Sequence, residues 1–123
     1  METDPVSRKR ILLVDDEQGV RIAVKLLLEA LFDYSITEAG NGREAFKIFS
    51  REKFDLVITD YSMPNMKGNQ LAKEIRKIAP SQPILMITAF ADQLRGSENP
   101  VDDILNKPFS ARELTQAIGK VLS

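Results

Sequence analysis

Short runs of consecutive apolar residues alternate along this chain with longer segments in which apolar residues recur every three or four positions. The short runs, "ILLV", "LVI" and "ILMI", have no polar interruption, which is typical of strands buried on both faces of a sheet. The longer segments have the spacing of amphipathic helices. In the segment 17–32 the residues on the predicted inner face are Val20, Val24, Leu27, Leu28 and Leu31.

This alternation predicts the order of the elements. We expect strands at 11–14, 34–39, 55–59, 84–88 and 101–105. We expect helices at 17–32, 43–51, 69–78 and 111–122. Asp16 stands at the N-cap position of the first helix, and Ser110 and Glu113 have the spacing of a capping box before the last. Gly96 and Pro100 disfavour a regular helix between the last two strands, so the fourth helix is expected to be shortened or irregular.

Strands and helices that alternate in this way form a parallel sheet with helices on both faces, and the crossovers are right-handed. The expected fold is therefore α/β and doubly wound, a flavodoxin-like (β/α)5 domain with strand order 2-1-3-4-5. We expect one domain over 10–123, preceded by a flexible N-terminal segment at 1–9. In this topology a ligand site lies at the carboxyl ends of strands 1 and 3.

Polar side chains end the predicted strands at this edge. Asp15 and Asp16 follow the first strand, Asp60 the third, and Lys107 the last, while Thr88 ends the fourth. Each has a simpler explanation by itself, as a helix cap, a turn residue, a β-branched strand residue or a solvated charge. Together they put three carboxylates at one place, where each pair repels by about 4 kcal/mol at an effective dielectric constant near 20. A hard divalent cation such as Mg²⁺ would offset this repulsion.

An aspartate beside Mg²⁺ can attack phosphorus and form an aspartyl phosphate. Lys107 would then hold one phosphoryl oxygen and the Thr88 hydroxyl would donate a hydrogen bond to another. Ala89, directly after Thr88, is small and would leave room for the phosphate.

Composition narrows the possible functions. The net charge of −1 argues against direct nucleic-acid binding and against a polybasic membrane surface. The chain has no cysteine and no histidine, so disulfides, thiol catalysis, Ser-His catalysis and phosphohistidine chemistry within the chain are excluded. Because no segment resembles a membrane helix or a signal peptide, we expect a cytoplasmic location.

The motifs "ILLVDDE", "DLVITDYSMPNMKG", "ILMITAF" and "LNKPF" resemble, in order and spacing, the receiver domain of two-component response regulators over residues 10 to 122. The resemblance implies that Asp15 (through water) and Asp16 bind Mg²⁺. It implies that Asp60 is the phosphorylated aspartate and also a metal ligand, and that Ser62 gives the metal its main-chain carbonyl oxygen.

The same resemblance makes Thr88 the switch hydroxyl and Lys107 the partner of the phosphoryl group, with a cis bond to Pro108. It also implies a sensor histidine kinase or phosphotransfer protein as donor and an effector domain or partner protein as output. Two features depart from the family pattern. Ile104 stands where the family has a switch aromatic, and Lys107 lies only 19 positions after Thr88, a shorter interval than is typical. The output surface is therefore expected to differ.

The sequence predicts a phosphoacceptor switch, not an enzyme in the usual sense, and leaves three alternatives open. An aspartyl-nucleophile phosphohydrolase usually has a second carboxylate two positions after the nucleophile, where this chain has Ser62. A flavin or nucleotide binder would need glycines or hydroxyls in the first loop, where "VDDEQG" offers acids that repel phosphate. A pseudo-receiver would bind a partner without phosphorylation. The cognate kinase, the output, and whether the chain acts alone or as a module stay open.

Overall fold

The computed structural model describes residues 8–95 and 99–123, and within them the chain forms five strands and five helices. The strands are β1 (Arg10–Val14), β2 (Ser35–Ala39), β3 (Leu56–Asp60), β4 (Ile84–Thr88) and β5 (Asp103–Asn106). The helices are α1 (Gln18–Phe32), α2 (Gly42–Arg51), α3 (Gly68–Ile78), α4 (Ala91–Leu94) and α5 (Ala111–Leu122). The strands form one parallel sheet in the order β2-β1-β3-β4-β5, which confirms the predicted flavodoxin-like fold.

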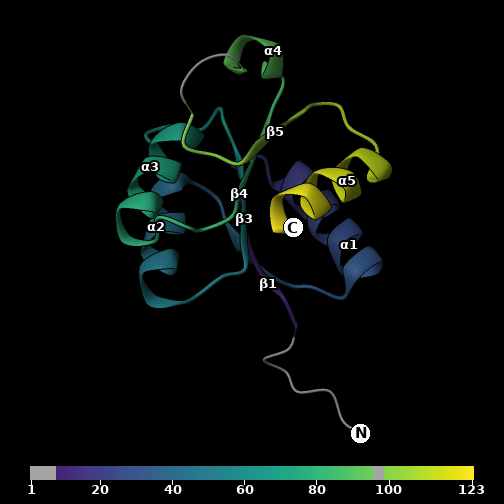
Figure 1. Ribbon diagram of the computed structural model, residues 1–123, viewed down its shortest axis with the longest axis horizontal. Coiled ribbons are helices and arrows are strands. Elements are labelled where there is room, and N and C mark those ends of the chain that lie inside the picture. The colour runs from purple at the N-terminus through teal and green to yellow at the C-terminus, as the bar shows by residue number, and fades with distance from the viewer. Residues whose placement is uncertain (1–7, 96–98) are drawn as a thin grey trace, which may run out of the picture.

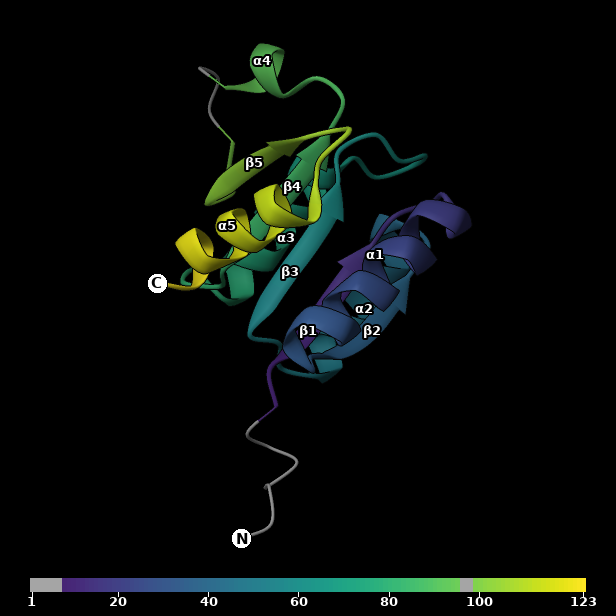
Figure 2. The same ribbon diagram turned by 90° about the vertical axis from the view of Figure 1, so that its right-hand side faces the viewer.

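Two helical layers cover the sheet (Figures 1 and 2). Helices α1 and α5 lie on one face and α2 and α3 on the other, while α4 lies beyond the edge strand β5. Because side chains alternate along a strand, neighbouring residues of β1 enter opposite cores. Ile11 and Leu13 pack in the α1–α5 core with Leu28, whereas Leu12 and Val14 pack in the α2–α3 core.

Three local predictions are wrong. The N-cap of α1 is Glu17 and not Asp16, because the chain continues in an extended conformation for one more residue before the helix begins. Leu31 is 48% exposed, because the inner stripe of α1 ends with Phe32, one turn after Leu28, and the Phe32 ring stacks on Tyr34. The last strand begins at Asp103.

The fourth helix is short, as the sequence predicts. Within the described residues α4 has four residues, and Arg95 follows it in an extended conformation. Among the described residues, two hydrogen bonds that involve side chains connect this segment to β5: Asn106 accepts from the Ala91 main-chain N–H at 3.1 Å, and Arg95 donates to the Ile104 carbonyl at 3.1 Å. Residues 96–98, which include Gly96, lie outside the described part of the chain.

The predicted flexible segment 1–9 falls mostly on residues 1–7, which also lie outside the described part, so this expectation stays a prediction. Arg8 and Lys9 do contact the domain: Arg8 donates to the Asp33 carbonyl and the Lys9 carbonyl accepts from Ser35. None of the helices in the described part of the chain is both long and apolar enough to span a membrane.

Candidate functional site

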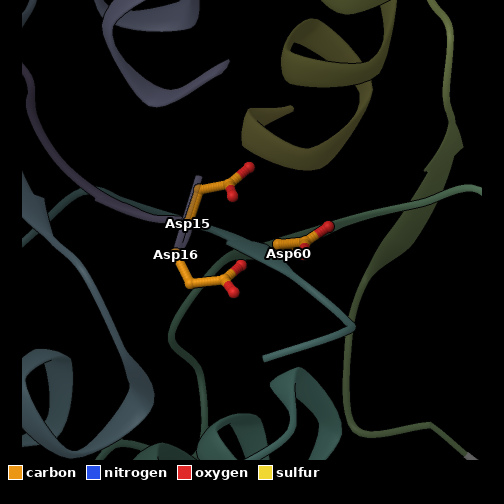
Figure 3. Close-up of side chains that lie close together, drawn as sticks. All are labelled: Asp15, Asp16 and Asp60. Carbon is orange, nitrogen blue, oxygen red and sulfur yellow. The ribbon is translucent and has the colours of Figure 1, made fainter. Parts of the chain in front are cut away.

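Three carboxylates meet at the carboxyl end of the sheet (Figure 3). Val14 pairs with Thr59 in the parallel register of β1 and β3, so Asp15 and Asp60 leave the sheet side by side. Asp15 and Asp60 are buried, at 5% and 6% exposure, and Asp16 is exposed. One oxygen from each carboxylate lies within 4.8 Å of the others. The structure therefore brings together the acidic residues that the sequence singled out.

Lys107 lies beside these carboxylates. Its Nζ is 2.9 Å from Asp60 Oδ1 and 3.5 Å from Asp15 Oδ2, and its side chain is 22% exposed. The residue follows β5 directly, its main-chain N–H donates to the Thr88 carbonyl at 2.8 Å, and its bond to Pro108 is cis. Lys107 is thus the fixed cation that the sequence predicted at this edge.

Burial and the neighbouring charges shift the pKa values of both Asp60 and Lys107. Burial raises the pKa of Asp60 above its usual value, and this outweighs the lowering effect of the hydrogen bond from Lys107. The neighbouring charges of Asp15 and Asp16 raise it further. Burial by itself would lower the pKa of Lys107, but the hydrogen bond to Asp60 and the negative charges of Asp60 and Asp15 raise it above its usual value. Lys107 therefore stays charged, while the ionised form of Asp60 is disfavoured in the folded protein.

This balance predicts that Asp60→Asn stabilises the metal-free protein at neutral pH. A raised carboxyl pKa favours folding while the group is protonated, and this contribution is lost as the pH rises through the folded-state pKa. Asparagine does not ionise, so the variant should have a higher Tm than the parent at pH 7. The gain should shrink as the pH falls toward about 4. Thermal unfolding in EDTA across pH 4–8 measures it, and a variant less stable than the parent at every pH would contradict it.

Thr88 and Ser62 lie at the same edge, and in the described part of the chain no hydrogen bond joins their side chains to the three acids. The Thr88 hydroxyl accepts a hydrogen bond from the Phe90 main-chain N–H at 3.0 Å, within the β4–α4 loop, and the residue is buried. Ser62 is exposed in the turn after β3. Its predicted role depends on its main-chain carbonyl and stays a prediction, as does the role of the Thr88 hydroxyl.

The turn after β3 holds Asp60 in place through close backbone packing. Asn65 adopts a left-handed conformation (φ 71°), and the Gly68 N–H donates to the Tyr61 carbonyl at 2.9 Å. A Cβ atom added at Gly68 would lie 2.3 Å from the Asp60 carbonyl oxygen. Only glycine allows the start of α3 to approach Asp60 this closely.

Gly68→Ala should therefore destabilise the domain by about 1–3 kcal/mol or more, because the clash is with main-chain atoms that cannot move independently. Gly119→Ala is the matched control: its Cβ would meet nothing within 4 Å in helix α5, and alanine there should stabilise by about 0.5–1 kcal/mol. Urea unfolding of both variants measures the difference. Equal stability of the Gly68 variant and the parent would show that the turn is not packed as described.

Two further residues contact the site's loops and were missed by the sequence reasoning. Arg21 on α1 donates to the Asp15 carbonyl oxygen, and Asn106 on β5 accepts from the first turn of α4. An arginine in the first turn of an amphipathic helix and an asparagine at a strand end are both typical of solvent-exposed positions, so their local sequence carries no signal for these contacts.

The donors suit a hard divalent cation. All three acidic ligands offer oxygen, and magnesium is typically bound by one or two carboxylates together with waters and substrate oxygens. Three carboxylates this close together repel one another, and two of them are buried, so positive charge is needed to offset the repulsion. Lys107 supplies one positive charge against the three acids. Asp15, Asp16 and Asp60 therefore fit Mg²⁺, with the exposed Asp16 on the solvent side of the cluster.

The response regulator receiver domain model matches residues 11–119. The chain belongs to this family. It is 43% identical over 115 residues to the probable transcriptional regulator ycf27 of Cyanidium caldarium and 36% identical over 117 residues to the alkaline phosphatase synthesis transcriptional regulatory protein PhoP of Bacillus subtilis. These alignments cover 91% and 93% of this chain but 45% and 48% of the regulators, so the chain spans about half their length.

Solved receiver structures have the same fold. The response regulator TrrA of Thermotoga maritima, in complex with Mg²⁺ and BeF, superposes with a TM-score of 0.86 at 38% identity, covering 93% of this chain and 99% of that one. The chemotaxis response regulator CheY4 of Vibrio cholerae has a TM-score of 0.83 at 28% identity, with coverage of 94% and 99%. The receiver is thus a two-component signalling module, and its acidic cluster lies at the predicted end of the sheet.

Proposed function

We propose that Asp60 of this receiver accepts a phosphoryl group from a phosphohistidine donor. A carboxylate oxygen of Asp60 forms the new bond to phosphorus, and the bond between phosphorus and the donor's imidazole nitrogen breaks. The observation that carries the proposal is the position of Asp60: it is buried, it pairs with Lys107 at 2.9 Å, and it lies beside two further acids. Its two acidic neighbours fit the metal that such a transfer needs.

The other residues have distinct roles in this proposal. When bound at Asp15, Asp16, Asp60 and the Ser62 carbonyl, Mg²⁺ would neutralise phosphoryl oxygens and orient the attack. Lys107, already beside Asp60, holds a phosphoryl oxygen after transfer. The Thr88 hydroxyl, which accepts a hydrogen bond from the Phe90 N–H, can donate its own hydrogen to a phosphoryl oxygen. Because this hydroxyl also holds Phe90, a movement of Thr88 toward the phosphoryl group would alter the β4–α4 loop, and we expect this loop to respond first.

Acetyl phosphate tests the transfer without a kinase. The parent protein, incubated with acetyl phosphate and Mg²⁺ and examined by intact mass, should gain one phosphoryl group, and EDTA should prevent the gain. A phosphohydrolase would instead turn over many equivalents of a small phosphate ester without a stable mass gain. A pseudo-receiver would show neither result.

Mg²⁺ should stabilise the parent protein, because it offsets the repulsion within the acidic cluster. A ligand at 100 times its Kd adds about 2.7 kcal/mol, which is roughly 8–16 °C in Tm for a domain of this size. Asp16→Ala should remove most of this shift while leaving the fold intact, because Asp16 is exposed. Glu29→Ala, at an exposed position further along α1, should retain it. A thermal-shift titration in which Mg²⁺ leaves the parent's Tm unchanged would count against a metal site.

The donor is a sensor histidine kinase or a phosphotransfer protein. An apolar groove of about 610 Å³ next to the site supports this, since Lys107 lies in its wall together with Pro108 and Phe109. The opposite wall is formed by α1 through Val20 and Leu27. A donor helix seated there would bring its phosphohistidine to the end of the sheet. The output partner is an effector domain or protein, as expected for a chain that spans about half of transcriptional regulators such as PhoP.

A further inference from the structure

Arg21 connects the first acidic loop to the edge of the sheet. Its Nε donates to Glu38 Oε1 on β2 at 3.0 Å, and its Nη1 donates to the main-chain carbonyl oxygen of Asp15 at 2.6 Å. The arginine and glutamate side chains are 16% and 29% exposed. Lys25, one turn further along α1, also pairs with Glu38, at 3.5 Å, but does not contact the acidic loop. A planar guanidinium with two fixed partners is well suited to hold a peptide group in one orientation.

The two acids of this loop are held in different ways. The Asp15 carboxylate has its own partners, because Oδ1 accepts from the Glu17 N–H at 2.9 Å and Oδ2 pairs with Lys107. Among the residues that the structure describes, no hydrogen bond or ion pair holds the exposed Asp16 carboxylate. The direction of Asp16 therefore depends on its backbone. The carbonyl that Arg21 holds belongs to the peptide group joining Asp15 to Asp16.

We infer that Arg21 is a positioning residue for the metal site: it fixes the Asp15–Asp16 peptide and so keeps Asp16 directed at the cation. Glu38 in turn orients Arg21, so the edge strand β2 acts on the site through this side chain, in addition to the hydrogen bond that its Ala39 carbonyl accepts from the Asp15 N–H. This inference rests on the proposed function, because the cation is the Mg²⁺ of that site. Partners of metal ligands act in this manner, and their loss typically weakens metal binding by about tenfold or more.

Whether Mg²⁺ binding becomes weaker or tighter when Arg21 is replaced distinguishes a positioning role from a purely electrostatic one. A guanidinium near the acidic cluster repels a cation, so removing its charge alone would tighten Mg²⁺ binding. Loss of the hydrogen bond to the Asp15 carbonyl would let Asp16 turn away and would weaken Mg²⁺ binding. Arg21→Met removes both the charge and the donors but keeps the apolar stem. Lys25→Met is the matched control, because it removes the same charge from the same helix face and leaves the loop contact intact.

Isothermal titration calorimetry with Mg²⁺ provides the main readout. Arg21→Met should bind Mg²⁺ about tenfold more weakly than the parent, and Lys25→Met should bind as tightly as the parent or slightly tighter. Arg21→Lys retains the charge and most of the packing but cannot hold both partners at once, so it should also bind more weakly. In the acetyl phosphate reaction, the Mg²⁺ concentration for half-maximal rate should rise in Arg21→Met while the rate at saturating Mg²⁺ recovers.

Unfolding curves in EDTA show whether each variant is folded, and if Arg21→Met does not fold, Arg21→Lys decides. Parent-like or tighter Mg²⁺ binding by the deciding arginine variant, with a parent that binds Mg²⁺ normally, overturns the positioning role and leaves the proposed function standing. If Lys25→Met weakened Mg²⁺ binding as much as Arg21→Met does, the positioning role would also be overturned. The loss of affinity would then come from removing a positive charge beside Glu38 and not from losing the contact with the Asp15 carbonyl. A parent that binds no Mg²⁺ overturns both.

Discussion

Asp60→Asn should abolish the Mg²⁺-dependent phosphoryl gain completely. The substitution removes the attacking oxygen anion while keeping the shape of the side chain, and the amide can still accept a hydrogen bond from Lys107. The variant should also be folded, because a neutral group at this buried position avoids the cost of ionising there. Loss of the gain therefore reports chemistry and not unfolding. Intact mass after incubation with acetyl phosphate gives the result directly.

Asp33→Asn is a suitable control for this experiment. Its side chain is 88% exposed and its backbone is left-handed (φ 54°), a conformation that asparagine tolerates well. It should gain one phosphoryl group as the parent does. If the Asp60 variant gained the same mass as the parent, peptide mapping would locate another acceptor, and the assignment of Asp60 would be wrong.

The fold could be predicted because its signals are local. Uninterrupted apolar runs in β1, β3 and β4 are long enough to identify central strands, and alternation with helices leaves few topologies. The positions of Asp15, Asp16 and Asp60 follow from that topology, since residues that end parallel strands share one edge. The N-cap of α1 did not follow, because Asp16 and Glu17 are both acidic and only the tertiary arrangement of the loop decides where the helix begins.

The contacts around the site could not be predicted from the sequence, since they join elements far apart in the chain. The Thr88 hydroxyl accepts a hydrogen bond from the Phe90 main-chain N–H, a contact within the β4–α4 loop that sequence patterns do not reveal. Arg21 reaches Glu38 across 17 positions and Asn106 reaches Ala91 across 15. Arg21 and Asn106 are polar side chains whose partners depend on how the strands are aligned in the sheet. Contacts of this kind produce no periodic pattern in the sequence.

We expect a change at the site to reach α4 through hydrogen bonds that lie next to Lys107. Its main-chain N–H donates to the Thr88 carbonyl, and the neighbouring Asn106 accepts from the Ala91 N–H at the start of α4. Ile104 has no ring to swing into space left by Thr88, so we expect these contacts, together with those of Phe90 to Thr88 and of Arg95 to Ile104, to connect the site to α4. A phosphoryl group would add about 1.5 to 2 negative charges beside Lys107, and we expect it to draw the Lys107 ammonium away from Asp60 and to disturb these hydrogen bonds.

Lys107→Ala should therefore have two large effects. In EDTA it leaves Asp15 and Asp60 buried without their cation, which should cost about 3 kcal/mol in unfolding free energy, at the lower end of the range for broken buried pairs because Lys107 is partly exposed. Mg²⁺ should restore much of this loss. The variant should still accept a phosphoryl group from acetyl phosphate, more slowly than the parent, but the modification should no longer reach α4.

Amide hydrogen exchange at residues 91–95 measures that second effect. In the parent these amides should exchange quickly, since α4 has four residues and few buried apolar contacts, and the rate should change when Asp60 is modified. Phosphorylated Lys107→Ala should show the rate of its unmodified form. Lys120→Ala, which removes an exposed lysine from α5, should behave as the parent. If phosphorylated Lys107→Ala changed its exchange as the parent does, the signal would reach α4 without Lys107, and its place in the switch would be wrong.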